Sequence, residues 1–329
     1  MLSYVGQRLV LLIPTAAGMV VVTFCLLLLI PGDPAAMLLG PEASPEAIQR
    51  LRTALGLDAS WYMRLGDYVL RLAQGDMGMS LFQNEPVSTV IFSRLGATVE
   101  LAVVALLLAS IAGIALGVAA ASRQGTMIDV GAMLLAQLGV SMPIYWLGIL
   151  LALFFSVHLG WLPAIGRGAP LPDALLAAVT GEPEVFVNFL SHLFLPALAL
   201  GANAAAVISR LVRASMLEVL SEDFVRTAHS KGLRPHRVIF AHVLRNALLP
   251  VISMIGLRFG ALLGGAVLTE SIFGWPGLGQ LTIAAISQRD LPLIQGITLT
   301  FAILFALVNL AVDLIYAAVD PRIRLGGVP

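Results

Sequence analysis

Long runs of apolar residues recur along this chain, for example at residues 101–121 and 301–319. A helix rises about 1.5 Å per residue, so about 20 residues cross the roughly 30 Å hydrocarbon core of a bilayer. The runs are apolar on every side, whereas strands of a membrane barrel alternate over segments of about ten residues. Charged residues make up only 12% of the chain, about half the share in soluble domains. The sequence therefore predicts an all-α integral membrane protein, whose backbone polar groups are bonded within its helices.

Six membrane-spanning helices are predicted from these runs. Their bounds are 9–30, 97–121, 130–157, 192–215, 248–270 and 294–319. The first run follows Arg8 and is longer than the roughly 7 to 15 apolar residues of a cleaved signal. No small-x-small cleavage site follows it cleanly, so we interpret it as an uncleaved first span. An even number of spans places both termini on one side of the membrane.

The distribution of positive charge predicts which side that is. The positive residues outside the long segment 31–96 gather on the side of the termini, at Arg8, Arg123, Arg210, Arg213, Arg226, Lys231, Arg234, Arg237, Arg245, Arg322 and Arg324. The two shorter loops on the other side hold only Arg167 and Arg289. Cytoplasmic loops are rich in Lys and Arg, and segments longer than about 60 residues cross the membrane largely regardless of charge. Both termini are therefore predicted to be cytoplasmic.

The outer segment 31–96 is predicted to be structured. Ser44 and Pro45 form a typical N-cap and first helical residue. Apolar residues then recur at helical spacing before Gly75, at Trp61, Leu65, Tyr68, Val69 and Leu72. Two short helices are expected against the outer membrane surface, where they either dock an extracytoplasmic partner or cap the bundle.

The cytoplasmic connection between the fourth and fifth spans carries its own helix signals. Ser221 is a predicted N-cap, and Lys231 stands in the last turn of the helix that follows. Gly232 suits a left-handed stop, and Pro235 opens a second helix that runs toward the membrane. The pattern predicts a helix of about ten residues, roughly 15 Å long, across the cytoplasmic face. On these signals alone, a simple surface anchor is the favoured interpretation.

A resemblance to a known family gives this connection a function. The residues Arg226-Thr227-Ala228 and Gly232 match the cytoplasmic Glu-Ala-Ala loop of the inner-membrane permeases of binding-protein-dependent ABC importers. The general pattern ends with an apolar residue, a leucine and a proline, where this chain has His242, Leu244 and Arg245. In that departure it is similar to the dipeptide, oligopeptide and nickel branch, which reads Arg-Thr-Ala-x-x-Lys-Gly and then His-x-Leu-Arg-Asn-Ala.

Further fragments resemble the same branch along nearly the whole chain. They are Pro31-Gly32-Asp33-Pro34, Gly75-Asp76-Met77-Gly78, Leu159-Gly160-Trp161-Leu162-Pro163, Glu270-Ser271-Ile272-Phe273, Pro276-Gly277-Leu278-Gly279, Arg289-Asp290-x-Pro292 and Asp320-Pro321-Arg322-Ile323-Arg324. The resemblance implies a type I ABC importer permease fold. It divides the chain into a first span with an outer segment (1–96), a permease core with five spans and a coupling helix at about 221–247 (97–319), and a cytoplasmic tail (320–329).

The resemblance also implies how the protein works and with whom. The short cytoplasmic helix would sit in a cleft of an ATPase subunit, whose nucleotide-driven closure swings the spans between inward-facing and outward-facing states. The implied coupling residues are Glu222, Arg226, Thr227, Ala228, Lys231, Gly232 and Arg245. The implied partners are a homologous second permease, two ATP-binding subunits that hold ATP and magnesium, an extracytoplasmic substrate-binding protein and the lipid of a bacterial inner membrane.

The chain itself is not expected to be an enzyme or to hold a cofactor or metal. A P-loop needs Gly-Lys-Ser/Thr, but the sole lysine, Lys231, precedes Gly232. No His-Glu-x-x-His helix is present, and His229, His236 and His242 are interpreted as ordinary polar residues of the cytoplasmic loop. The formal net charge is zero, so no basic face indicates nucleic acid. An intramembrane enzyme is therefore a weak alternative.

Two charges within spans are candidates for a substrate path. Arg258 lies near the middle of the fifth span, where a charge costs at least roughly 2.5 kcal/mol and should face a wet cavity or a partner. It either contacts substrate or pairs with a neighbouring helix. Glu270 lies near the end of the same span, where an interfacial position is expected. The resemblance implies the permease subunit of an ATP-driven dipeptide or oligopeptide importer, which forms half of the translocation path. A nickel or glutathione importer permease remains an alternative. An ion-coupled secondary transporter is a further one, but the inverted repeats typical of that class are not evident.

Overall fold

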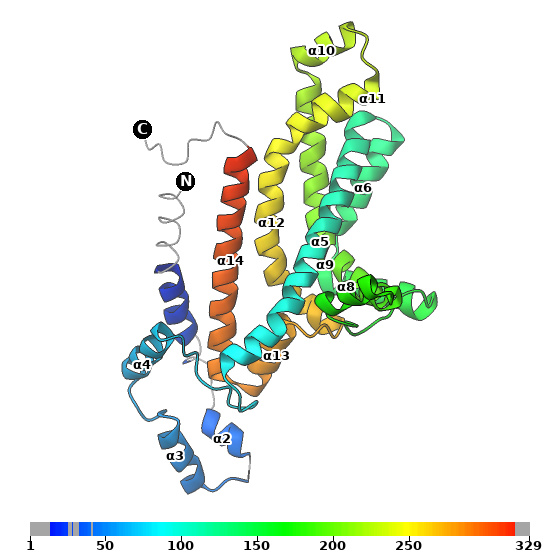
Figure 1. Cartoon of the computed structure of the whole chain (residues 1–329). Helices are drawn as coiled ribbons and strands as arrows, with labels where there is room; N and C mark the ends of the chain where they lie inside the picture. The colour runs from blue at the N-terminus through cyan, green and yellow to red at the C-terminus, as the bar shows by residue number, and fades with distance from the viewer. Residues whose placement is uncertain (1–13, 26–27, 29–32, 41, 320–329) are drawn as a thin grey trace, which may run out of the picture. The chain divides into compact units, whose positions relative to one another are not determined.

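The computed structural model describes residues 14–25, 28, 33–40 and 42–319 (Figure 1). The predicted tail at 320–329 and the ends of the predicted first span lie outside these residues. The described chain forms two compact units, one from residues 1–96 with 277–306 and the other from 97–276 with 307–329.

The first unit holds three short helices in the outer segment. They are α2 (Pro34–Leu39), α3 (Pro45–Ala54) and α4 (Trp61–Ala73). Ser44 caps α3 by accepting a hydrogen bond from the backbone N–H of Ala47 at 3.2 Å, as predicted. Two of the three helices match the predicted pair, whereas α2 was not expected; it begins where Asp33 accepts from the N–H of Ala35 at 3.0 Å.

Two apolar clusters hold the first unit together. One joins the start of α5 (Val87–Ser122) to α13 (Leu278–Gln288) and the start of α14 (Leu291–Val319), through buried residues such as Ile91 and Leu293. The other packs Tyr68 of α4 against Val20, which belongs to the helix Pro14–Cys25, and against Leu299. The outer helix α4 is thus fixed to apolar helices of its own unit.

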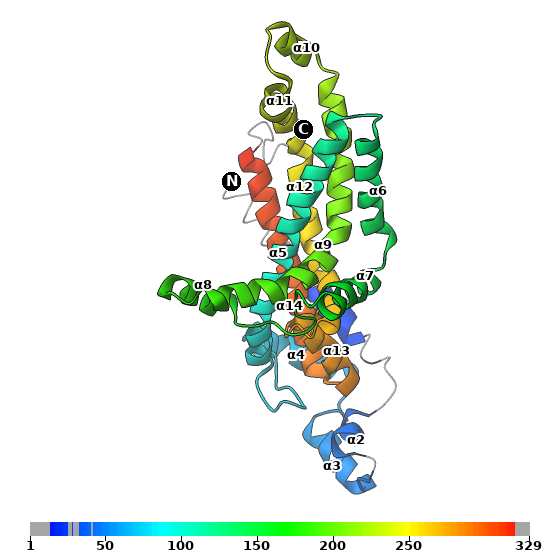
Figure 2. The same cartoon turned by 90° about the vertical axis from the view of Figure 1, so that its right-hand side faces the viewer.

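The second unit is built around one long helix, α9 (Pro183–Leu220). Its elements after the first part of α5 are α6 (Met127–Ser141), α7 (Ile144–Leu151), the π-helix η1 (Ala152–His158), α8 (Leu171–Thr180), α9 (Pro183–Leu220), α10 (Asp223–Ser230), α11 (Pro235–Arg237), the π-helix η2 (Val238–Val243) and α12 (Leu244–Ile272). Helix α6 runs alongside α9 (Figure 2). The apolar core of the second unit includes Leu101, Leu200 and Met216. Close approach of α5 and α9 depends on Gly201, because an added Cβ there would lie 2.6 Å from the carbonyl oxygen of Ala105.

The described helices fit the prediction of a membrane protein. Four of them are long and apolar enough to cross a bilayer, and a fifth span is obtained if a bent pair counts as one. The four are Val87–Ser122, Pro183–Leu220, Pro235–Ile272 and Leu291–Val312. Of the predicted first span at 9–30, the structure describes a helix at Pro14–Cys25.

The predicted third span, 130–157, is not one continuous helix. It divides into Met127–Ser141 and Ile144–His158, which meet at 110°. The break follows from Pro143, because a proline disfavours the helical conformation of the residue before it. Met142 accordingly has an extended backbone, with φ −90° and ψ 129°.

Candidate coupling site

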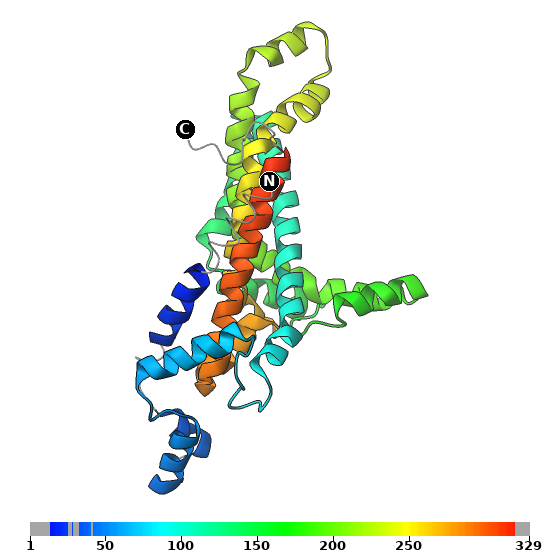
Figure 3. The ribbon, with the colours of Figure 1, turned by 60° about the vertical axis from the view of Figure 1, so that its left-hand side comes forward.

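Helix α10 is a short, capped element between two long helices. Glu222 is its N-cap, with an extended backbone, and Asp223 complements the positive end of the helix. Gly232 follows with φ +74°, a left-handed conformation that reverses the chain and that a residue with a side chain would resist. Figures 1 and 3 place α10 and α11 beyond the end of the α9 and α12 pair, at the opposite end of this unit from α8.

The prediction that Ser221 caps this helix was wrong. Ser221 instead ends α9, and both its N–H and its hydroxyl donate to the carbonyl oxygen of Glu218, at 3.1 and 2.7 Å. Because α9 extends to Leu220, α10 has eight residues rather than about ten.

The two faces of α10 differ in character. Val225 and Ala228 are 3% and 9% exposed and belong to the same apolar cluster as Val238 and Val243. Arg226 points outward, and its ion pair with Asp223 at 3.4 Å is fully accessible to water, so it contributes little stability. Phe224 is 43% exposed beside these charges. The helix is therefore held by one face and offers an aromatic and charged face outward.

The structure brings six of the seven predicted coupling residues together. Five of them are exposed on or beside α10, namely Glu222, Arg226, Thr227, Lys231 and Gly232, whereas Ala228 faces inward. Arg245 is exposed at the start of α12. Within the described residues no hydrogen bond or ion pair joins it to α10. Sequence reasoning missed Phe224, although the inward spacing of Val225 and Ala228 implies that Phe224 faces outward.

The two predicted path residues have different surroundings. Arg258 is half-buried in α12, and among the described residues it has no hydrogen bond or ion pair. Glu270 lies near the end of α12, as expected, but its side chain is fully buried. Its carboxylate accepts a hydrogen bond from the hydroxyl of Thr98 at 2.7 Å. This carboxylate is thus buried within the protein rather than exposed to water at an interface.

A second polar cluster lies near Glu270. Sequence reasoning did not find it. Arg167 pairs with Glu100 at 2.6 Å, and its guanidinium carbon lies 5.8 Å from the ring centre of Trp275. The indole N–H of Trp275 donates to the carbonyl oxygen of Ala97 at 2.8 Å. These residues are predicted to be extracytoplasmic or at that end of their spans. The cluster ties the loop before α8 to the interior of α5 and to the turn that follows α12.

Replacing Arg167 by methionine is expected to destabilise the protein by about 3 to 5 kcal/mol, because Glu100 would keep a charge with no cation beside it in a site that is 11% exposed. Thermal unfolding of the purified complex, followed by light scattering or intrinsic fluorescence, measures the effect. Arg123→Met, on the exposed turn after α5, is the control. Equal unfolding temperatures for the two variants would contradict a stabilising role for the pair.

Two of the sequence fragments that resemble the permease branch meet in the first unit. Asp290, from Arg289-Asp290-x-Pro292, is fully buried and accepts from the hydroxyl of Ser80 at 2.6 Å and the N–H of Phe82 at 3.3 Å. Gly78, from Gly75-Asp76-Met77-Gly78, lies against Pro292. These contacts join the turn after α4 to the start of α14. Among the described residues, no group of three or more metal-ligating side chains is present.

Comparison with known proteins identifies the family of this fold. The family described as binding-protein-dependent transport system inner membrane component matches residues 113–325, and the model of its N-terminal part matches 1–102. The chain is 46% identical to the di/tripeptide transport system permease protein DppB of Pseudomonas aeruginosa, over 98% of this chain and 99% of that protein. It is 44% identical to the dipeptide transport system permease protein DppB of Escherichia coli K12, over the same shares of the two chains.

Two further similarities complete the comparison. The glutathione transport system permease protein GsiC of Salmonella typhimurium is 42% identical, over 98% of this chain and 99% of that protein. A chain of the methionine ABC transporter MetNI, solved in inward-facing conformations, is 19% identical, with a TM-score of 0.55 over 71% of this chain and 97% of that chain. This structural likeness shows the fold of an ABC importer permease. The chain therefore belongs to the binding-protein-dependent transport system inner membrane component family.

Proposed function

We propose that this chain is the membrane-spanning permease subunit of an ATP-driven importer of dipeptides or other short peptides. The substrate class rests on the near full-length likeness to the two DppB permeases. The observation that carries the mechanism is the two-faced helix α10, buried through Val225 and Ala228 and exposed through Phe224 and Arg226. A helix held in this way transmits a push on its outer face to α9 and α12.

The proposed coupling residues are those of the exposed face and its end. Phe224 supplies an apolar anchor for a cleft in an ATPase subunit, and Arg226 and Lys231 supply charge around it. Aromatic and arginine side chains dominate the affinity of many protein interfaces. Arg245 belongs to this group only if the partner spans from α10 to the start of α12. ATP and magnesium are assigned to the partner.

A complete importer is proposed to need a second, homologous permease, two ATP-binding subunits and an extracytoplasmic substrate-binding protein. The name of the family supports a binding protein, and the membrane-spanning helices support contact with lipid. Arg258 and Glu270 stay as candidates for the path. Of the two, Arg258 is the better one, because Glu270 is bonded to Thr98 inside its unit.

Purification from the native host tests this proposal. We expect a tagged chain to copurify with P-loop subunits and a second permease, and the reconstituted complex with its binding protein to take up radiolabelled alanyl-alanine only with ATP. Uptake driven by an ion gradient without ATP would contradict the proposal. If the importer carries glutathione and excludes dipeptides, its substrate is instead the one named for the relative GsiC.

A further inference from the structure

The first unit contains a charged cavity that the coupling mechanism does not use. Its volume is about 1100 Å³, and side chains from the helix Pro14–Cys25, from α3 and α4 and from the α13–α14 junction line it. Small-molecule sites are concave and typically about 300 to 1,000 Å³ in volume. Most of its lining residues belong to the segment 31–96, which is predicted to face the outside of the cell. Its size suits a ligand of a few residues.

Three arginines line this cavity without a carboxylate partner. Arg64, Arg71 and Arg289 each lack an ion pair within the described part of the chain. Arg64 is half-buried, and its guanidinium carbon lies 5.9 Å from the ring centre of Phe24. Burial lowers the pKa of this guanidinium. Removal of a charge from water is costly unless it is paired, so the half-buried, unpaired Arg64 favours a negatively charged group in this cavity.

Tyr68 adds a hydroxyl without a partner. Its side chain lines the same cavity and is 6% exposed, and its oxygen has no hydrogen-bond partner among the described residues. Burial raises the pKa of Tyr68 to about 12, although Arg71 acts in the opposite direction, so the hydroxyl keeps its proton at neutral pH. Few buried polar groups in native proteins lack a partner, and each needs an explanation.

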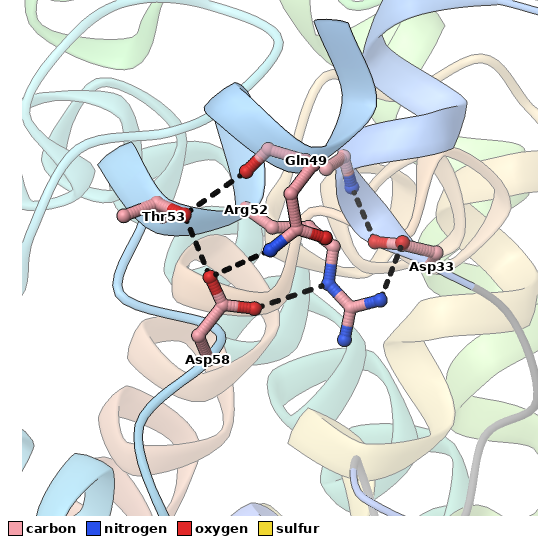
Figure 4. A network of polar contacts seen from close by, with 6 residues as sticks. Asp33, Gln49, Arg52, Thr53 and Asp58 are labelled. Atoms are coloured by element: carbon pink, nitrogen blue, oxygen red, sulfur yellow. Dashed lines mark hydrogen bonds and ion pairs between the residues drawn. The ribbon is translucent and has the colours of Figure 1, made fainter. Parts of the chain in front are cut away.

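The cavity also offers a negative group and a fixed wall. Asp67 lines it and makes no ion pair in the described chain. The wall near α3 is held by a network in which Arg52 contacts Asp33 at 3.5 Å and Asp58 at 3.6 Å (Figure 4). Thr53 adds a hydrogen bond to Asp58 at 2.7 Å. Arg52 thus already has two carboxylate partners, so Arg64, Arg71 and Arg289 are the arginines available to a ligand.

We propose that this cavity binds a short peptide in its zwitterionic form, with the carboxylate at Arg64 and Arg71, the hydroxyl of Tyr68 beside them and the ammonium group at Asp67. The inference rests on the proposed function, since it assigns the cargo of the importer a site outside the membrane. Such a site would hold the peptide on the permease itself, separate from any path residue of the spans. Arginine suits this role because its planar fork matches a carboxylate.

Equilibrium dialysis of the permease and ATPase assembly in nanodiscs, without its binding protein, tests the site. The probes are radiolabelled alanyl-alanine and its C-terminal amide. We expect saturable binding of the free dipeptide and binding of the amide that is weaker by about tenfold or more, because a charge-assisted hydrogen bond is lost. Equal binding of the two probes, or no saturable binding, would overturn the proposal.

Two matched pairs of variants locate the binding. Arg64→Gln should weaken dipeptide binding by about ten- to a hundredfold, whereas Arg50→Gln on the exposed surface of α3 should not. Tyr68→Phe should weaken it by about three- to tenfold without lowering the unfolding temperature, because the hydroxyl has no partner in the protein. Tyr62→Phe is its control on α4, with 61% of the side chain exposed.

The outcomes separate this site from the proposed function. If Arg64→Gln binds the dipeptide like the unmodified assembly, the site is refuted, and ATP-driven dipeptide uptake by the complete importer still supports the proposed function. If the complete importer carries no dipeptide, the proposed function fails whatever the binding assay shows. Loss of binding in Arg64→Gln and Tyr68→Phe, with both controls unaffected, supports the site.

Discussion

Replacing Gly232 by valine is expected to lower ATP-driven uptake by about five- to thirtyfold, because a β-branched side chain at positive φ costs about 1 to 2 kcal/mol or more. Gly232 has φ +74°, and an added Cβ there meets no atom within 4 Å. The effect would therefore act through the backbone, which must turn to relieve the strain and so re-aim α10 against α11. Uptake and substrate-stimulated ATP hydrolysis by the assembled complex measure the loss of coupling.

Two controls separate coupling from a general loss of stability. Gly232→Asn should retain most of the uptake, since asparagine tolerates the left-handed region. Gly181→Val places the same side chain at φ +99° in the open turn between α8 and α9, away from α10. If Gly232→Val keeps both uptake and stimulated hydrolysis, α10 is not the coupling helix. If Gly181→Val is equally damaging, strain at any turn explains the loss.

The local features of the candidate site could be predicted from the sequence, because they depend on single residues. Glycine at 232 indicates positive φ, and proline at 235 indicates the start of a helix; both are confirmed. Serine at 221 misled the prediction because a hydroxyl can cap the start of one helix or bond to the last carbonyls of the preceding one. Only the length of α9, which ends at Leu220, decides between them.

Prolines within apolar runs show why the broken span was missed. Pro196 and Pro250 lie inside the continuous helices α9 and α12, whereas Pro143 separates α6 from α7. Within a membrane, neighbouring helices can satisfy the carbonyl that a proline leaves free, so the residue alone does not fix the outcome. The environment of each proline is a tertiary property that apolar periodicity does not contain.

The polar contacts between distant segments could not be predicted for the same reason. Arg167 and Glu100, or Ser80 and Asp290, come from separate parts of the chain. Each was visible only as an isolated charge or as part of a family resemblance. Their pairing depends on how helices pack, which single residues do not encode.

Breaking the ion pair between Asp129 and Arg213 is expected to lower the unfolding temperature of the protein, because either single replacement removes the two charge-assisted hydrogen bonds of the other group. The two guanidinium nitrogens of Arg213 contact the two carboxylate oxygens of Asp129 at 2.7 and 2.8 Å, and the N–H of Gly125 donates to the same carboxylate at 3.0 Å. The Asp129 side chain is 7% exposed. The pair joins the first turn of α6 to the part of α9 that leads to α10.

A double-mutant cycle measures the pair directly. Asp129→Leu and Arg213→Met should each lower the unfolding temperature, and the double variant should be more stable than the sum of the two single effects predicts. Arg210→Met is the control one turn earlier on α9, because Arg210 makes only a long, exposed contact to Gln137 at 3.4 Å. Additive effects in the cycle would mean that the pair contributes no stability of its own. If the double variant recovers stability but not uptake, the link between α6 and α9 takes part in the movement that α10 starts.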